Sequence, residues 1–179
     1  ALVLGVPGEA VMGLWGPDYV AGTAALAFLL AAEVAASMAV VSESVLVYIA
    51  RKRNLAISVG IIALQAGLTV ALILAARNAG LGAGYEAAGA AGALMLALAV
   101  SSLVKALLLS RLLDARVTSW RWALVYAAAA AVVVGQLFTY LPEWVELLIG
   151  IPAVLGTYAL VIWRRGFDEN DKVLFRKKV

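Results

Sequence analysis

A few polar side chains lie inside long apolar stretches of this sequence, where ionisable groups are unusual. They are Glu33, Ser37, Glu43, Ser44 and Lys105. A charged group without a partner inside a bilayer costs roughly 3 kcal/mol or more, so such groups generally face other protein segments or water. We therefore expect these residues to line a path for a substrate or an ion.

Glu33 is the leading candidate among them. At about 100° per residue, Ser37 lies about 40° and Ser44 about 20° from Glu33 around a helix axis, so the three form one polar stripe. A polar stripe on an apolar helix is typical of the wall of a water-filled path, where a carboxylate can carry a coupling ion. The alternative is a structural role, in which a protonated Glu33 is hydrogen-bonded to a neighbouring helix.

Glu43 and Lys105 lie nearer to the basic ends of their segments. Glu43 is offset by about 80° from Glu33 and lies about 15 Å further along the helix. Lys105 has about the same depth, so it could form an ion pair with a neighbouring helix, contact an anionic substrate, or extend its stem to the lipid headgroups. For Glu43, a purely structural role beside the basic edge is the alternative.

The elements that must position these side chains are long apolar runs. Hydrophobic residues make up 65% of the chain and the mean hydropathy is +1.00. A helix of about 20 apolar residues crosses a hydrocarbon core of about 30 Å. We predict an all-α, polytopic membrane protein with a single transmembrane domain over residues 1–179. Its expected spans are 21–50, 55–76, 87–113, 122–140 and 144–163.

Other architectures fit the pattern less well. A soluble helical bundle would show a polar face at the 3.6-residue period, and a membrane β-barrel would alternate apolar and polar residues. The stretches 94–100 and 126–134 are continuously apolar. These runs therefore favour membrane-spanning helices.

The basic residues predict the orientation of these spans. All but Arg77 and Lys105 lie in alternate gaps or in the tail: Arg51, Lys52, Arg53, Arg111, Arg116, Arg121, Arg164, Arg165, Lys172, Arg176, Lys177 and Lys178. By the positive-inside rule, the loops and the 164–179 tail that carry them are cytoplasmic. The net charge of +3 is then explained by topology, and no nucleic-acid partner is expected.

The absence of Cys and His excludes several kinds of chemistry. Without either residue there is no thiolate nucleophile, no imidazole base and no ordinary zinc site, and we expect no cofactor or metal. A membrane-embedded transferase would need a catalytic cluster at one membrane face. The outer loops offer only Glu9, Asp18, Glu86, Glu143 and Glu146. We therefore expect no enzyme, with a transferase as the least favoured alternative.

Small residues and one proline predict local features of two spans. Gly84, Gly89 and Gly92 lie at the start of the third span, and small residues let membrane helices approach closely. We expect this span to be an inner, tightly packed helix, although glycines there could also form an adaptable loop. Pro152 removes a backbone donor, so a kink or broken turn is expected in the fifth span.

The first six residues are apolar but too few to span a bilayer. We expect them to be the stump of a preceding helix, so that the chain would be the C-terminal half of a larger transporter. A mature protein trimmed by a peptidase is the alternative.

Several short motifs resemble those of one transporter family. They are 14–21 (LWGPDYVA), the basic turn 50–54 (ARKRN), 84–93 (GYEAAGAAGA), 110–113 (SRLL) and 166–172 (GFDENDK). Together they are similar to the second half of bacterial polysaccharide flippases of the multidrug/oligosaccharidyl-lipid/polysaccharide exporter superfamily. Trp15 stands where that family usually has Phe.

The resemblance implies a carrier of about twelve helices in two six-helix halves, with the pathway between the halves. It would flip a lipid-linked oligosaccharide, of the kind used in polysaccharide and lipopolysaccharide synthesis, across the bacterial plasma (inner) membrane by alternating access. Its partners would be the missing N-terminal half of the same chain, membrane lipids and a proton or sodium ion. A multidrug exporter of the same superfamily is the alternative. No family motif assigns the coupling role to Glu33.

Overall fold

The computed structural model describes residues 2–5, 7–114, 122–138, 140 and 145–165. Within these ranges all regular secondary structure is helical, which confirms the predicted all-α class. The chain's contacts divide it into two compact units, one of Ala1 and Met12–Ser119 and one of Leu2–Val11 and Trp120–Val179. We describe each unit by itself.

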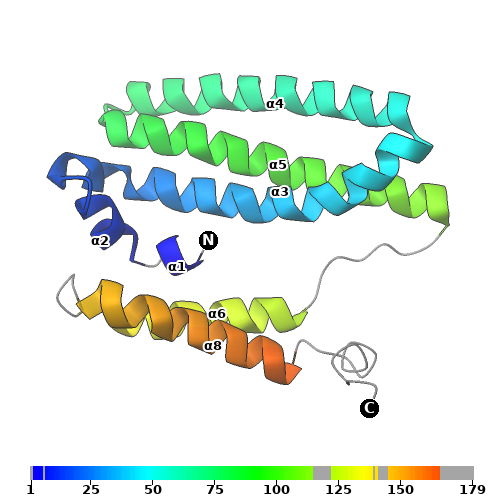
Figure 1. Ribbon diagram of the computed structural model, residues 1–179. Helices are drawn as coiled ribbons and strands as arrows, with labels where there is room; N and C mark the ends of the chain where they lie inside the picture. The colour runs from blue at the N-terminus through cyan, green and yellow to red at the C-terminus, as the bar shows by residue number, and fades with distance from the viewer. Residues whose placement is uncertain (1, 6, 115–121, 139, 141–144, 166–179) are drawn as a thin grey trace, which may run out of the picture. The chain divides into compact units, whose positions relative to one another are not determined.

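The first unit is built from three long antiparallel helices. A short 3₁₀ helix, η1 (Pro17–Gly22), leads into α3 (Thr23–Ile49), and α4 (Arg51–Asn78) and α5 (Ala83–Leu113) follow. Figure 1 shows α5 between α3 and α4, and each of these two packs along it. Among the described residues, three segments are long and apolar enough to cross a membrane: Pro17–Val40, Arg51–Asn78 and Ala83–Leu113. The structure therefore supports a multi-pass membrane protein.

Two of these helices begin before the apolar runs do. Only Ala50 separates α3 from α4, so the basic residues 51–53 form the first turn of α4 instead of a loop before it. Similarly, α5 begins at Ala83, which places Glu86 in its first turn. Hydropathy marks the part of a helix that lies in lipid, whereas the helix itself continues into the headgroup region. The helices α4 and α5 therefore begin before the predicted spans at 55 and 87, and the span boundaries themselves stay a prediction.

Helix α5 is the inner helix of the first unit, as its small residues predict. Most of the residues buried on it are small, and five of them recur every fourth position: Ala93, Ala97, Ser101, Lys105 and Leu109. A Cβ added to Gly84 would lie 2.6 Å from the backbone oxygen of Ala21 in η1. Only glycine therefore permits this approach of the two backbones.

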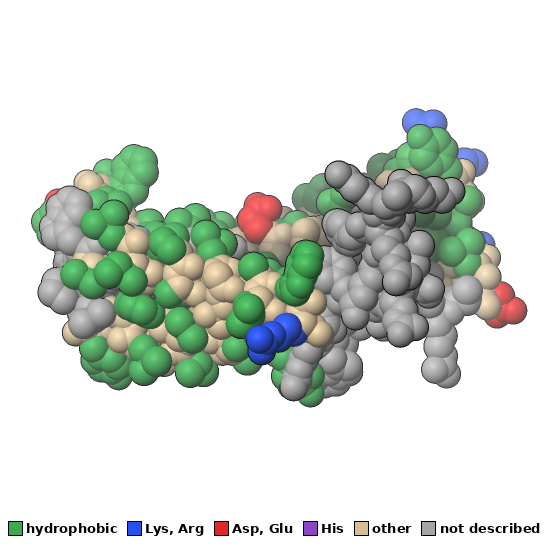
Figure 2. Space-filling model, turned by 60° about the horizontal axis from the view of Figure 1, so that its bottom comes forward, with side chains coloured by type: hydrophobic (Ala, Val, Ile, Leu, Met, Phe, Trp, Pro, Cys, Tyr) green, Lys and Arg blue, Asp and Glu red, His purple; other side chains and the backbone are tan. Residues whose placement is uncertain are grey.

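The outside of the first unit is largely apolar. On α4, the side chains of Leu55 and Ile62 are 64% and 65% exposed, and Val59, Val70 and Leu74 are also exposed. Hydrophobic side chains also predominate, and charged ones are few, among the described residues on the face in Figure 2, which brings the side of α6 and α8 forward. A continuous apolar surface of this kind is stable in lipid and not in water. This surface agrees with the helix lengths in indicating a bilayer environment.

The second unit contains shorter helices. They are α1 (Leu2–Gly5), α6 (Trp122–Phe138), the π-helix η2 (Glu146–Gly150) and α8 (Ile151–Arg165), while α2 (Gly8–Gly13) runs from this unit into the first. Helices α6 and α8 pack together and have 17 and 15 residues. Their buried side chains include Ala127, Ala131 and Val154.

The expected interruption near Pro152 is confirmed. The π-helical turn of η2 ends at Gly150, and Pro152 follows as the second residue of α8. Proline has no N–H to donate, and its ring clashes with the carbonyl four residues earlier in an α-helix. A wider π-turn before the proline relieves this conflict.

Candidate functional site

The main polar contact of the first unit is an ion pair between α3 and α5. The Nζ atom of Lys105 lies 2.9 Å from Oε2 of Glu43. The lysine side chain is 5% exposed, whereas the glutamate side chain is 43% exposed. Of the three expectations for Lys105, the helix-to-helix ion pair is therefore the one that the structure shows.

The small-residue face of α5 explains how a lysine comes to be buried here. Ser101 and Leu109 lie one turn to either side of Lys105 and are themselves buried. On α3, the buried face includes Ser42 and Leu46, so Glu43 lies at the edge of this face. Because α5 carries small side chains, α3 approaches closely enough for the carboxylate to reach the ammonium group. In an ion pair the two opposite charges compensate each other, which lowers the free-energy cost of placing them among apolar side chains.

Glu33, Ser37 and Ser44 occupy a different face of α3. All three are exposed, as expected for one continuous stripe, whereas Ala32, Ala39 and Leu46 form the buried side. The Ser37 hydroxyl donates a hydrogen bond to the Val34 carbonyl, 2.8 Å away. The structure thus divides the predicted residues into two groups, and their role in a pathway stays a prediction.

Two buried serines were not singled out from the sequence. Ser101 lies one turn before Lys105 on α5, and Ser42 directly precedes Glu43 on α3; each is 4% exposed. The four-residue spacing of Ala97, Ser101 and Lys105 could have identified Ser101, because residues four apart share a helix face. Nothing in the sequence of α3 alone separates Ser42 from the exposed Ser44.

A second ion pair joins the C-terminal end of α4 to the N-terminal end of α5. The Nη2 atom of Arg77 donates to Oε2 of Glu86 across 2.9 Å. Both side chains are accessible to solvent, at 62% and 29%. This pair links the two helices on either side of their connecting residues. It brings no side chain into a position for chemistry.

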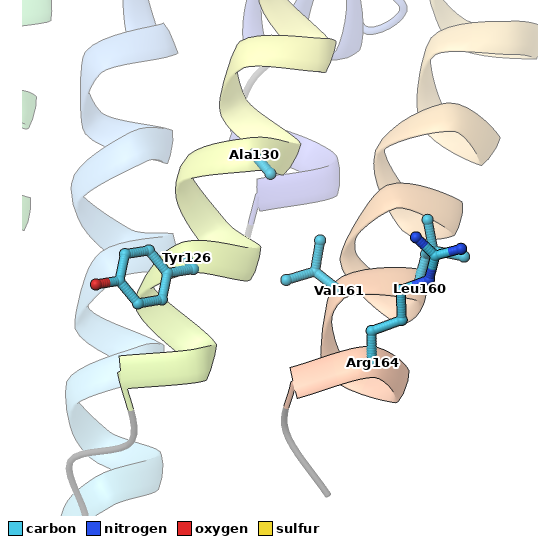
Figure 3. A pocket seen from close by; sticks show the side chains of 5 residues that line it. All are labelled: Tyr126, Ala130, Leu160, Val161 and Arg164. Atoms are coloured by element: carbon cyan, nitrogen blue, oxygen red, sulfur yellow. The ribbon is translucent and has the colours of Figure 1, made fainter.

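The second unit has a small groove between α6 and α8, with a volume of about 310 Å³. Tyr126 and Ala130 line it from α6, and Leu160, Val161 and Arg164 line it from α8 (Figure 3). None of the residues predicted to line a pathway belongs to it. Within the described ranges, no group of three or more acidic side chains could hold a metal ion.

Comparisons with known protein families, with curated proteins and with solved structures found no match. The resemblance to polysaccharide flippases therefore rests on the sequence motifs, and the site rests on the geometry of α3 and α5.

Proposed function

We propose that the chain is the C-terminal half of an ion-coupled exporter that flips a lipid-linked oligosaccharide across the bacterial inner membrane. In this proposal α6 and the segment from 144 to 163 join the three long helices of the first unit to make five membrane spans. The observation that carries the proposal is the Lys105–Glu43 pair between two helices with apolar outer surfaces. An ion pair with one buried partner adds little stability compared with apolar residues, which favours a role beyond packing.

The charge of Lys105 supports an anionic substrate. Within the described part of the chain, it is the one buried basic residue. Its ion-pair partner is Glu43, whose side chain is the more exposed of the two. An anionic group entering from that side could replace the carboxylate without leaving the ammonium group unpaired. A pyrophosphate-linked lipid has such a group.

The exposed carboxylate of Glu33 makes a multidrug exporter the second candidate. A cationic drug would pair with a carboxylate, and Glu33 is available on the exposed face of α3. In the flippase proposal the same carboxylate binds the coupling ion, while Ser37 and Ser44 continue the polar stripe. The two functions therefore differ in what is transported and share the same acidic residue.

Substitution of Glu33 in the complete transporter tests the proposal. We expect Glu33→Gln to reduce oligosaccharide export by about 100-fold, because an amide cannot carry the coupling proton or sodium ion. Export is measured by surface polysaccharide, membrane insertion by the amount of protein in the membrane fraction, and drug transport by efflux of a cationic dye. Asp18→Asn, in η1 just before the first predicted span, is the matched control and should export normally.

Normal export by the Glu33→Gln variant would show that Glu33 does not couple export to the ion. If the native transporter instead moves the dye and no oligosaccharide, the multidrug alternative is correct.

A further inference from the structure

One end of the first unit carries a patch of exposed positive charge. Arg51, Lys52 and Arg53 form the first turn of α4, and Arg111 lies in the last turn of α5; all four are exposed. Figure 1 shows the α3–α4 link and the C-terminal end of α5 at the same end of this unit. We call these four residues the inner basic patch.

No ion pair is found at the patch within the described part of the chain, and one exposed carboxylate, Asp114, follows Arg111 by three residues. The ion pairs found in that part are Arg77–Glu86 and Lys105–Glu43, and no described carboxylate lies within salt-bridge distance of the patch. The first turn of α4 contains no acidic residue, and its N-cap, Ala50, offers no side-chain hydrogen bond. The three charges in the first turn of α4 are therefore open to an anion from outside the unit.

The location of three of these charges is itself unfavourable for a helix. The N-terminus of a helix carries a partial positive charge, so cations in the first turn are repelled and anions are attracted. Arg51, Lys52 and Arg53 add to that positive potential. An external anion bound at the first turn of α4 would be attracted chiefly by these three side chains, because the C-termini of α3 and α5, which carry partial negative charge, lie at the same end.

The surroundings of the patch indicate that this anion belongs to an amphiphile. Next to the patch, Tyr48 is 89% exposed and Leu55 is 64% exposed, and Ile49 is also exposed. A phospholipid places its phosphate among the basic side chains and its acyl chains against such apolar side chains. Free phosphate would use only the first of these features.

We propose that the inner basic patch binds the headgroups of anionic phospholipids. The proposal needs only that α3, α4 and α5 lie in a bilayer, and it is independent of the transported substrate. Each basic residue near an anionic membrane surface strengthens binding by about fivefold. The patch should therefore enrich anionic over zwitterionic lipid around this end of the unit.

Native mass spectrometry of the purified full chain tests this proposal. The protein is exchanged into micelles containing equal amounts of phosphatidylcholine and phosphatidylglycerol, and the bound lipids are counted. We expect the native protein to enrich phosphatidylglycerol. In the triple variant Arg51→Gln, Lys52→Gln, Arg53→Gln, the enrichment should fall about fivefold for each charge removed. In Lys52→Gln alone it should fall about fivefold.

Two controls separate charge from other effects. Arg51→Lys with Arg53→Lys keeps the charge and should keep the enrichment, while Arg77→Gln removes a cation from the opposite end and should change it little. Circular dichroism checks the helix content, and the single Lys52→Gln variant serves if the triple variant unfolds. Unchanged enrichment in a folded variant would overturn the proposal. Displacement of the lipid by a modest excess of inorganic phosphate would overturn it too, since the site would then be one for free phosphate.

Discussion

Lys105 and Glu43 are unequal partners, because one is buried and the other is half-exposed. Removing the partner of a buried charge leaves that charge without compensation, whereas a half-exposed charge can still reach water or headgroups. The two single substitutions should therefore have different effects on stability. This asymmetry follows from the exposed fractions of the two side chains.

We expect Glu43→Gln to destabilise the protein more than Lys105→Met. Loss of the carboxylate leaves the Lys105 ammonium group unpaired, at a cost of about 3 kcal/mol. Loss of the ammonium group removes a buried charge and leaves Glu43 half-exposed, which we expect to cost about 1 kcal/mol after allowance for that exposure. Thermal unfolding in detergent measures both, with Arg77→Gln as a control for an exposed ion pair.

The exchanged pair, Glu43→Lys with Lys105→Glu, separates stability from transport. It should recover part of the lost stability but no oligosaccharide export, because the cation no longer lies at residue 105. A larger destabilisation by Lys105→Met than by Glu43→Gln would contradict the asymmetry.

The sequence placed Glu43 and Lys105 at the same depth but did not determine their contact. Depth follows from counting residues along a helix, at about 1.5 Å each. Contact depends also on the rotation of each helix about its axis, and an apolar helix buried in lipid shows little polar periodicity from which to infer it. For that reason, Glu33 and Glu43 could both be proposed for one path, although they belong to different faces of α3.

Among the helices, α5 has the closest packing, and its glycines are not equivalent. Gly84 lies against the backbone of η1, whereas no atom lies within 4 Å of a Cβ added at Gly67 in α4. Both residues are within helices. The two glycines therefore make a matched pair for testing helix packing.

We expect Gly84→Ala to destabilise the first unit by about 1–3 kcal/mol, because the backbones of α5 and η1 must move apart. Gly67→Ala should instead stabilise α4 by about 0.5–1 kcal/mol, since alanine favours a helix over glycine. The measurement is again thermal unfolding in detergent. Equal effects of the two substitutions would show that the contact at Gly84 contributes nothing to stability.

Helix ends were harder to predict than helix existence. The small residues of α5 and the proline of α8 each act locally. The inner position of α5 and the interruption before α8 could therefore be predicted from the sequence. The start of α4 did not, because Arg51, Lys52 and Arg53 interrupt the apolar run without interrupting the helix. Polar residues end a hydropathy signal, but only capping or backbone effects end a helix.

For the whole molecule, an odd number of membrane crossings in the first unit would place its two ends on opposite sides of the membrane. The three candidate segments, Pro17–Val40, Arg51–Asn78 and Ala83–Leu113, are consistent with this arrangement. By the positive-inside rule, the distribution of Lys and Arg predicts its orientation, with the inner basic patch on the cytoplasmic side. The division into two units, in contrast, depends on packing between helices and could not be inferred from hydropathy.

Cysteine labelling tests this topology on a clean background, because the chain has no native cysteine. We expect Leu81→Cys, in the α4–α5 connection, to react with a membrane-impermeant maleimide added outside intact cells. Lys52→Cys should react only after the membrane is opened. Labelling of both from the same side would contradict the proposed crossings.

The single residue between α3 and α4 limits how these helices can move. One residue spans at most about 3.6 Å, so the two helices cannot separate at Ala50. The connection between α4 and α5 has four residues, 79–82, and allows more displacement. A change in the angle between α3 and α4 would therefore pivot at Ala50, and the larger displacement would occur at the ends of these helices far from Ala50.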